Sequence, residues 1–431
     1  MKLLIKGGRV VDPASGKDEV GDVFISDGMI SSKKEKADQT IDAKGLVVAP
    51  GLIDLSARLR EPGQEYKATL ASEMDAAVAG GVTSLACPPD THPPLDEPGL
   101  VDMLRRRAKA LSRARVYPVG ALTVKLAGER LTEMSVLADA GCVAFSQANV
   151  PVTDTQVLWR ALQYAATFAY PVWLRAEDRW LAGDGVAHDG EMATRLGLAG
   201  IPAFAETIAL GSTLQLVRAT GTRVHFCRLS TAAGVEIIRA AKKEGLPVSC
   251  DVGIHHVHLC ELDLGYYDSN CRLEPPLRSQ RDRDALAAGL ADGSVDCAVS
   301  DHTPVDEDAK TLPFAEAEPG ATGLELLLGL ALKWGQEDGV GLPRALAVLT
   351  SEPARVLGPA LGTLQASAGQ LLDGGVADVC IFDPQAAWTV TPAALRSQGR
   401  NTPFAGHELP GPVRYTIVGG QVAFEAKANG A

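Results

Sequence analysis

The sequence predicts an α/β fold: a (β/α)8 barrel of the TIM type, joined to a small β-sandwich domain built from both termini. Eight short apolar runs, separated largely by segments with helical spacing, occupy the middle of the chain, which is typical of a closed parallel barrel. Both ends carry short strand-like segments with glycine turns. A doubly wound open sheet is the alternative fold, but eight evenly spaced repeats favour closure.

The two ends of the chain resemble each other in pattern. Strand-like segments occupy residues 3–6, 9–11, 22–26 and 46–49, and again residues 378–382, 388–390, 415–418 and 421–424. Glycine-containing turns separate them. We therefore predict a composite β domain of residues 1–50 and 365–431 around a barrel of residues 51–364.

The predicted barrel strands are residues 52–56, 82–87, 116–121, 142–146, 172–175, 223–228, 247–252 and 295–300. Helical spacing occurs between them at residues 66–79, 97–111, 155–167, 203–219 and 231–244. In such a barrel the functional side chains follow the C-terminal ends of the strands. Those positions are the candidates for a site.

Composition excludes several classes of protein. Of 431 residues, 46% are hydrophobic and 22% charged, which excludes intrinsic disorder as the main state. The formal net charge of −12 argues against a nucleic-acid partner. The one strong basic cluster, at 105–107 with Lys109, Arg113 and Arg115, is interpreted as a solvated helix face.

Nothing in the sequence predicts a membrane protein or a disulfide framework. The longest apolar stretch, around 324–332, is far shorter than the ~20 residues that a membrane span needs. The first residues lack a signal-peptide hydrophobic region. Eight cysteines without a C-x-x-C pair are typical of reduced, buried thiols. We expect a cytoplasmic protein.

Several short motifs, in this order and spacing, make the chain resemble the dihydroorotase branch of the amidohydrolase superfamily. The motif L-R-E-P-G at 59–63 favours dihydroorotases over hydantoinases and allantoinases. The others are P-G-L-I-D at 50–54, E-Y-K at 65–67, P-P-L-R at 275–278, D-H-T-P at 301–304, G-A-T-G-L-E at 320–325 and N-T-P-F at 401–404 with Gly406.

The resemblance implies a site with one or two zinc ions, but this sequence departs from the family's ligands. The family places an H-x-H after strand one, and here those positions are Ser56 and Arg58. The ligand after strand four falls on or beside Gln147. The histidines after strands five and six are replaced by Arg175 and Arg228, and the aspartate after strand eight is kept as Asp301.

These replacements predict that the zinc site is lost. Zinc binds imidazole, thiolate or carboxylate, whereas guanidinium has no lone pair to offer and stays charged. Without a metal there is no activated water at neutral pH and no Lewis acid on a ring carbonyl. We predict no catalytic residue, no metal and no cofactor at this pocket.

The positions that would recognise a substrate carboxylate are also altered. The family arginine is present as Arg60, but two family asparagines are replaced by Asp90 and Glu274, which oppose an anionic ligand. His302 matches a family substrate contact, yet its neighbours no longer support that role.

Other histidines are weak metal candidates. The run H-H-V-H at 255–258, followed by Cys260, has H-x-H spacing, but the matching family stretch supplies no metal ligands, so loop histidines are the simpler interpretation. His225 lies inside an apolar strand and is interpreted as a hydrogen-bonded core residue.

The arginines themselves support a hypothesis. An aspartate left in a pocket without metal is costly unless its charge is compensated. We expect that at least one of three arginines, at positions 58, 175 and 228, pairs with Asp301. The alternative is that all three have drifted onto the surface.

These observations predict a scaffold that keeps its fold without its chemistry. In the resembling family, some bacterial chains lack activity and assemble with aspartate transcarbamoylase. We therefore predict a structural subunit for the aspartate transcarbamoylase catalytic chain, self-associated in a large symmetric complex. The alternatives are a hydrolase with an altered metal site or metal-free mechanism, and a regulator that senses a small anion.

Overall fold

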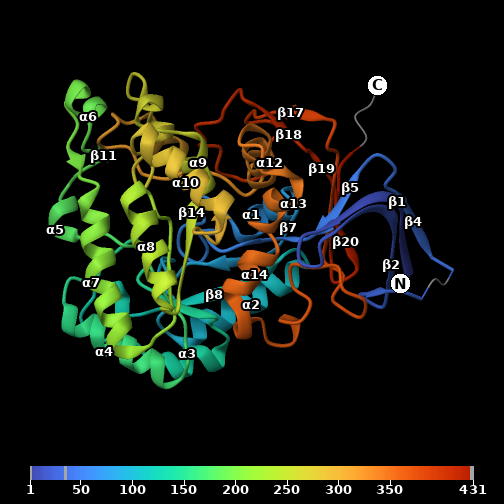
Figure 1. Cartoon of the computed structure of the whole chain (residues 1–431), viewed down its shortest axis with the longest axis horizontal. Helices are drawn as coiled ribbons and strands as arrows, with labels where there is room; N and C mark the ends of the chain where they lie inside the picture. The colour runs from blue at the N-terminus through green and yellow to red at the C-terminus, as the bar shows by residue number, and fades with distance from the viewer. Residues whose placement is uncertain (1, 34–35, 428–431) are drawn as a thin grey trace.

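The barrel predicted from the sequence is present. The computed structural model describes residues 2–33 and 36–427, and eight parallel strands pair in chain order around the barrel (Figure 1). They are β6 (Leu52–Asp54), β7 (Val82–Cys87), β8 (Arg115–Ala121), β9 (Ala144–Ser146), β10 (Val172–Leu174), β13 (Val224–Phe226), β14 (Val248–Gly253) and β15 (Cys297–Val299). Each coincides with a predicted run to within a few residues.

The first and last strands meet just beyond their ends. Ala57 forms a parallel bridge with His302. The Arg58 amide donates to the His302 carbonyl (2.9 Å), and the His302 amide donates to the Ser56 carbonyl (3.1 Å). This closure joins two segments that are 245 residues apart and forms part of the barrel mouth.

Helices cover the outside of the barrel. The main ones are α1 (Leu70–Ala79), α2 (Pro98–Leu111), α3 (Met134–Ala140), α4 (Thr155–Thr167), α7 (Phe204–Thr220), α8 (Ala232–Glu244), α10 (Gln280–Asp292), α12 (Leu327–Glu337) and α13 (Gly341–Ala347). Shorter elements are α5 (Arg179–Ala182), α6 (Glu191–Leu196), α9 (Ile254–His258), α11 (Glu307–Thr311), β11 (Ala187–His188) and β12 (Gly200–Ile201). The predicted helical segments agree with α1, α2, α4, α7 and α8.

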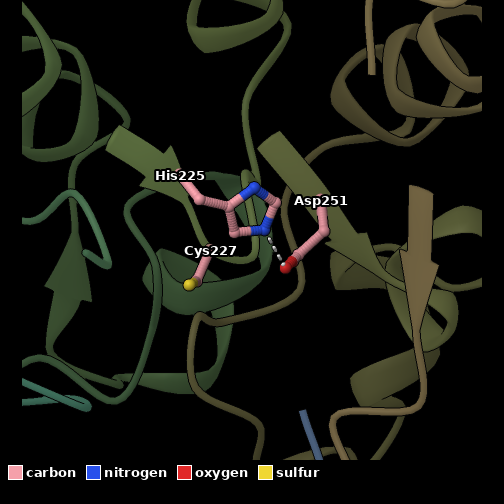
Figure 2. Close-up of side chains that lie close together, drawn as sticks. All are labelled: His225, Cys227 and Asp251. Carbon is pink, nitrogen blue, oxygen red and sulfur yellow. Dashed lines mark hydrogen bonds and ion pairs between the residues drawn. The ribbon is translucent and has the colours of Figure 1, made fainter. Parts of the chain in front are cut away.

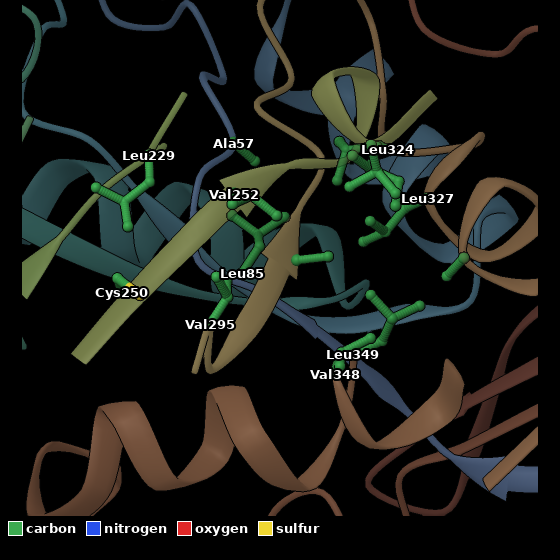
Figure 3. Packing of buried hydrophobic residues seen from close by; sticks show 14 of the residues in the cluster. Ala57, Leu85, Leu229, Cys250, Val252, Val295, Leu324, Leu327, Val348 and Leu349 are labelled. Carbon is green, nitrogen blue, oxygen red and sulfur yellow. The ribbon is translucent and has the colours of Figure 1, made fainter. Parts of the chain in front are cut away.

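Helix α4 illustrates why these segments are helical. Asp154 caps its first turn by accepting from the amides of residues 156 and 157. Its buried residues, Leu158, Ala161, Leu162 and Ala165, recur at helical spacing and form one apolar stripe. That stripe belongs to the large core cluster, which packs the helices against the barrel; Figure 3 shows part of this cluster.

A second cluster includes residues of the barrel strands that lie on the opposite face from the helices. Successive residues of a strand point to opposite faces, so alternate positions such as Ile53, Ala86, Val119 and Trp173 gather in it. Unlike the helices that cover the outside, α14 (Ser351–Leu357) contributes residues to this interior cluster. The barrel interior is therefore a packed core rather than an open channel.

Strands from both ends of the chain form one further eight-stranded sheet. Its order is β20-β19-β16-β5-β1-β2-β3, with β4 on β1. The bounds are β1 (Lys2–Asp12), β2 (Lys17–Ser26), β3 (Met29–Ser31), β4 (Gln39–Asp42), β5 (Val47–Pro50), β16 (Val379–Phe382), β19 (Val413–Val418) and β20 (Gln421–Glu425). A separate pair joins β17 (Ala387–Thr389) to β18 (Glu408–Pro410).

One prediction about this sheet was wrong. We predicted a turn at Gly7-Gly8 between two strands, whereas β1 continues through it with a register shift between Ile5 and Gly8. A Cβ at Gly8 would lie 2.5 Å from Val48 Cγ2, so glycine is needed there for a close approach between strands rather than for a turn. The strands β3, β4 and β18 were not expected from the sequence.

The structure also describes the cysteines, the helix lengths and the basic cluster. All eight cysteines are free thiols, and six are buried. Within residues 2–33 and 36–427, no helix is long and apolar enough to cross a membrane. The basic cluster is partly engaged in ion pairs, such as Arg113 with Asp75 (2.6 Å) and Arg115 with Asp378.

Candidate functional site

The candidate site lies where the barrel strands end. Arg58, Gln147, Arg175, Arg228 and Asp301 follow β6, β9, β10, β13 and β15 respectively, so the parallel strands carry them to one mouth. The three arginines in this group are buried. The structure therefore contradicts the alternative in which the arginines drift onto the surface.

Two of the arginines hold Asp301. Its Oδ1 accepts hydrogen bonds from Arg58 Nη1 (3.2 Å) and Arg228 Nη1 (3.1 Å), and from Ser56 Oγ (3.3 Å). The Asp301 side chain is only 12% exposed. The hypothesis that an arginine pairs with this aspartate is confirmed for Arg58 and Arg228.

Arg175 pairs with two glutamates instead of Asp301. Its Nη2 forms ion pairs with Glu177 (2.5 Å) and Glu274 (2.9 Å), and no direct bond to Asp301 is present among the described residues. Glu274 is thus held by a cation, as is Asp90, whose Oδ2 accepts from Arg58 Nε at 2.7 Å. The two carboxylates that replace family asparagines are partners of the arginines.

Asn149 connects the network and was missed by the sequence analysis. Its Oδ1 accepts from Arg228 Nη2 (2.6 Å) and Arg58 Nη2 (3.1 Å), and its Nδ2 donates to Glu274 (3.1 Å). The signal that could have found it is its place two residues beyond Gln147, in the same strand-end segment. One neutral amide thereby links two arginines to an acid of another loop.

The charges in this cluster stabilise each other. Burial disfavours the charged form of Asp301, but the positive charges of Arg228 and Arg58 outweigh it and hold its pKa below the usual range. The pKa of Asp90 is lowered in the same way, against burial, chiefly by Arg58. These carboxylates are therefore ionised at neutral pH and balance the arginines.

Two of the predicted site residues, Gln147 and Arg60, bond to structural partners instead. Gln147 donates to the Leu126 carbonyl (2.8 Å) and accepts from Thr123 (2.9 Å). Arg60, at a positive φ of 60°, donates to the Pro304 carbonyl (2.7 Å). Each of these two side chains fixes a loop at the barrel mouth.

His302 faces the buried wall of the barrel. Its Nε2 lies 2.5 Å from a carboxylate oxygen of Glu73, a residue of α1, and its Nδ1 accepts from the Gly323 amide (3.1 Å). Both ring nitrogens are therefore occupied. Glu73 also accepts from Ser397 Oγ (2.6 Å), so this pair ties the barrel to the C-terminal segment.

The other histidines have ordinary partners. Those at 255, 256 and 258 lie in the short helix α9 rather than in a loop, and each ring is within hydrogen-bond distance of one backbone carbonyl. Burial lowers the pKa of His255 and His258 to about 4, so both are neutral. His225 is hydrogen-bonded inside the barrel, as predicted.

The side chains at the family's ligand positions do not fit a pair of zinc ions. Guanidinium groups donate hydrogen bonds but offer no lone pair, and Arg58 and Arg228 present two positive charges to the one retained carboxylate. Serine and glutamine are not ligands that structural or catalytic zinc commonly uses. The arginines and Asp301 form a closed ionic network.

The fold places this network at the mouth of a (β/α)8 barrel, and comparisons with known proteins identify the family. A family model described as Dihydro-orotase-like matches residues 45–233. The "Dihydroorotase-like protein" of Pseudomonas aeruginosa is 45% identical over 430 residues, which cover 99% of this chain and 100% of that protein. The chain therefore belongs to the dihydroorotase-like family.

Two further comparisons complete this placement. A protein of Trichlorobacter lovleyi named "Dihydroorotase" is 40% identical over 432 residues, covering 99% of this chain and 100% of that protein. The solved L-hydantoinase of Arthrobacter aurescens has a TM-score of 0.86 at 24% identity, covering 98% of this chain and 96% of its own. The latter likeness is one of fold.

Proposed function

We propose that this chain is a non-catalytic member of its family that serves as a structural subunit for aspartate transcarbamoylase. One observation carries the loss of catalysis: Arg58 and Arg228 bond to Asp301 and to Asn149, in the space where the family resemblance puts the metal ions. A guanidinium cannot activate water as zinc does.

The proposed partner comes from the family resemblance, and the intact scaffold supports it. The barrel strands, the closure at Ala57 and His302 and the terminal sheet are all intact, while the reactive positions are replaced. A chain that keeps its fold and loses its chemistry is suited to a role that uses its surface, such as assembly. A large complex of closed symmetry with the transcarbamoylase catalytic chain is the form that we propose.

A second function is favoured by the names of relatives. Several proteins 40–43% identical to this chain are named "Dihydroorotase", which supports a hydrolase with an altered metal site. A third is an anion sensor at the four pocket arginines, Arg58, Arg60, Arg175 and Arg228. It is disfavoured because each of these guanidiniums already pairs with a carboxylate.

The test has two arms, one for chemistry and one for assembly. The purified full chain, supplied with Zn²⁺, is assayed for dihydroorotate hydrolysis, and we expect no turnover above a blank without protein. Metal content alone is not the criterion; zinc-dependent turnover would overturn the proposal.

In the second arm, the chain is co-expressed with the aspartate transcarbamoylase catalytic chain of its own organism, and the complex is sized by light scattering after gel filtration. We expect co-elution in a fixed ratio and a transcarbamoylase that is less active or less stable without this chain. Separate elution, with unchanged transcarbamoylase activity, would refute the assembly role. The anion-sensor alternative then predicts a thermal shift with pyrimidine metabolites.

A further inference from the structure

A group of potential metal ligands lies inside the barrel, below the arginine network. Figure 2 shows His225, Cys227 and Asp251, whose ligand atoms all lie within 4.8 Å of one another. None of the three is among the positions that the family resemblance assigns to metal ligands. His225 and Asp251 are buried and Cys227 is partly exposed.

The strand register explains how the group arises. His225 of β13 is aligned with Ser249 of β14, and Cys227 and Asp251 each lie two residues further along. Side chains two apart on a strand share a face. Trp173, whose ring is 5.3 Å from that of His225, belongs to the cluster inside the barrel and places this face there.

We propose that His225, Cys227 and Asp251 form a binding site for a divalent transition-metal ion such as Zn²⁺. Imidazole nitrogen, thiolate sulfur and carboxylate oxygen are the three donor types that zinc takes in proteins. Zinc–ligand distances of about 2.0–2.3 Å require ligand atoms roughly 3.3–3.8 Å apart, so side-chain adjustments of about 1 Å suffice.

Hydrogen bonds from neighbouring groups orient two of the proposed ligands, His225 and Asp251. Ser249 Oγ lies 2.8 Å from His225 Nδ1, and the other ring nitrogen, Nε2, faces Asp251 Oδ2 at 2.8 Å. A metal-ligating histidine commonly has its second nitrogen held by such a hydrogen bond. The Arg228 amide donates to Asp251 Oδ1 (2.6 Å). Binding exchanges the contact between His225 and Asp251 for two bonds to the ion.

The charges also balance. A thiolate at Cys227 and the carboxylate of Asp251 neutralise a divalent ion, and the thiol proton is released on binding. The nearby guanidiniums of Arg58 and Arg228 are already offset by Asp90 and Asp301. Cys227 is partly exposed, and we expect a water molecule to supply the fourth ligand.

Buried Trp173 is consistent with a polar fourth ligand in this compartment. Its Nε1 has no hydrogen-bond partner among the described residues, although its ring packs beside His225.

The test is Co²⁺ binding to the full chain after metal is stripped with a chelator. We expect about one Co²⁺ per chain, a thiolate-to-cobalt charge-transfer band in the near ultraviolet, and competition by Zn²⁺. Cys227→Ser should abolish the band, whereas Cys142→Ser, a change at another partly exposed thiol, should keep it. Ser249→Ala should weaken affinity by about 10–100-fold.

His225→Gln provides a second variant in case Cys227→Ser does not fold, and circular dichroism checks both. Absence of the band in the wild-type chain, or its persistence in Cys227→Ser, would overturn the proposal. Loss of Co²⁺ binding in Asp301→Asn, with the band unaffected by Cys227→Ser, would place the ion at the barrel mouth instead. Dihydroorotate turnover is not part of the readout, so this inference fails or stands separately from the proposed function.

Discussion

The network around Asp301 makes a quantitative prediction about stability. The substitution Asp301→Asn removes the buried carboxylate that forms ion pairs with both Arg58 and Arg228. Arg58 keeps Asp90 at 2.7 Å, whereas the only ion pair of Arg228 among the described residues is with Asp301. Leaving a buried charge without its partner costs about 3–5 kcal/mol. We expect the lower end, about 3 kcal/mol of unfolding free energy, because one of the two cations stays paired.

The assay is urea unfolding followed by tryptophan fluorescence, with Asp139→Asn as the control. Asp139 is an exposed residue of α3, where such a change should alter the unfolding free energy by no more than about 0.5 kcal/mol. If Asp301→Asn unfolds like this control, then the ionic network does not support the fold and our account of the arginines is wrong.

The pH dependence of this difference has a definite sign. Because the pKa of Asp301 is lowered in the folded state, its contribution is fully present above the unfolded value of about 3.8 and is lost as pH falls through the folded value. The gap between wild type and Asp301→Asn should therefore stay constant near neutral pH and close only in acid.

Two further predictions concern stability. Burial raises the pKa of Glu325 to about 7, so protonation of this carboxyl favours the folded state. The wild type should therefore lose about 3 kcal/mol of unfolding free energy as the pH rises from about 4.5 to 7. Glu325→Gln should remove this pH dependence, and equal slopes for the two proteins in urea titrations would refute the prediction. At Gly63, φ is +91° and a Cβ would lie 1.7 Å from the His92 carbonyl oxygen, so Gly63→Ala should cost at least about 2 kcal/mol. Gly99→Ala, in open space on α2, is the matched control and should be neutral or stabilising by up to about 1 kcal/mol; similar thermal unfolding of the two variants would contradict the reasoning.

Much of the fold could be predicted because hydrophobic periodicity is a local signal. Apolar runs predicted the barrel strands, and helical spacing predicted the helices. The break predicted at Gly7-Gly8 was wrong because a glycine required for close packing in β1 resembles, in one dimension, a glycine required for a turn.

The candidate site shows the same division. Given the family resemblance, residue types predicted that arginines at three of the ligand positions do not ligate zinc, since the chemistry of guanidinium does not depend on context. They did not determine the partners. Asp301 accepts from Arg58 and Arg228 but not Arg175, and Asn149 joins the network, because hydrogen bonds depend on distances of a few tenths of an ångström between loops far apart in the chain.

The sequence by itself thus determined the fold class, the family resemblance and the replacement of the ligand residues. Only the tertiary structure decided which acid each arginine holds, that His302 faces Glu73, and that His225, Cys227 and Asp251 meet inside the barrel. Parallel strands bring together residues tens to hundreds of positions apart, and the register of neighbouring strands fixes which side chains face each other. That register is a property of the closed barrel and of no single segment.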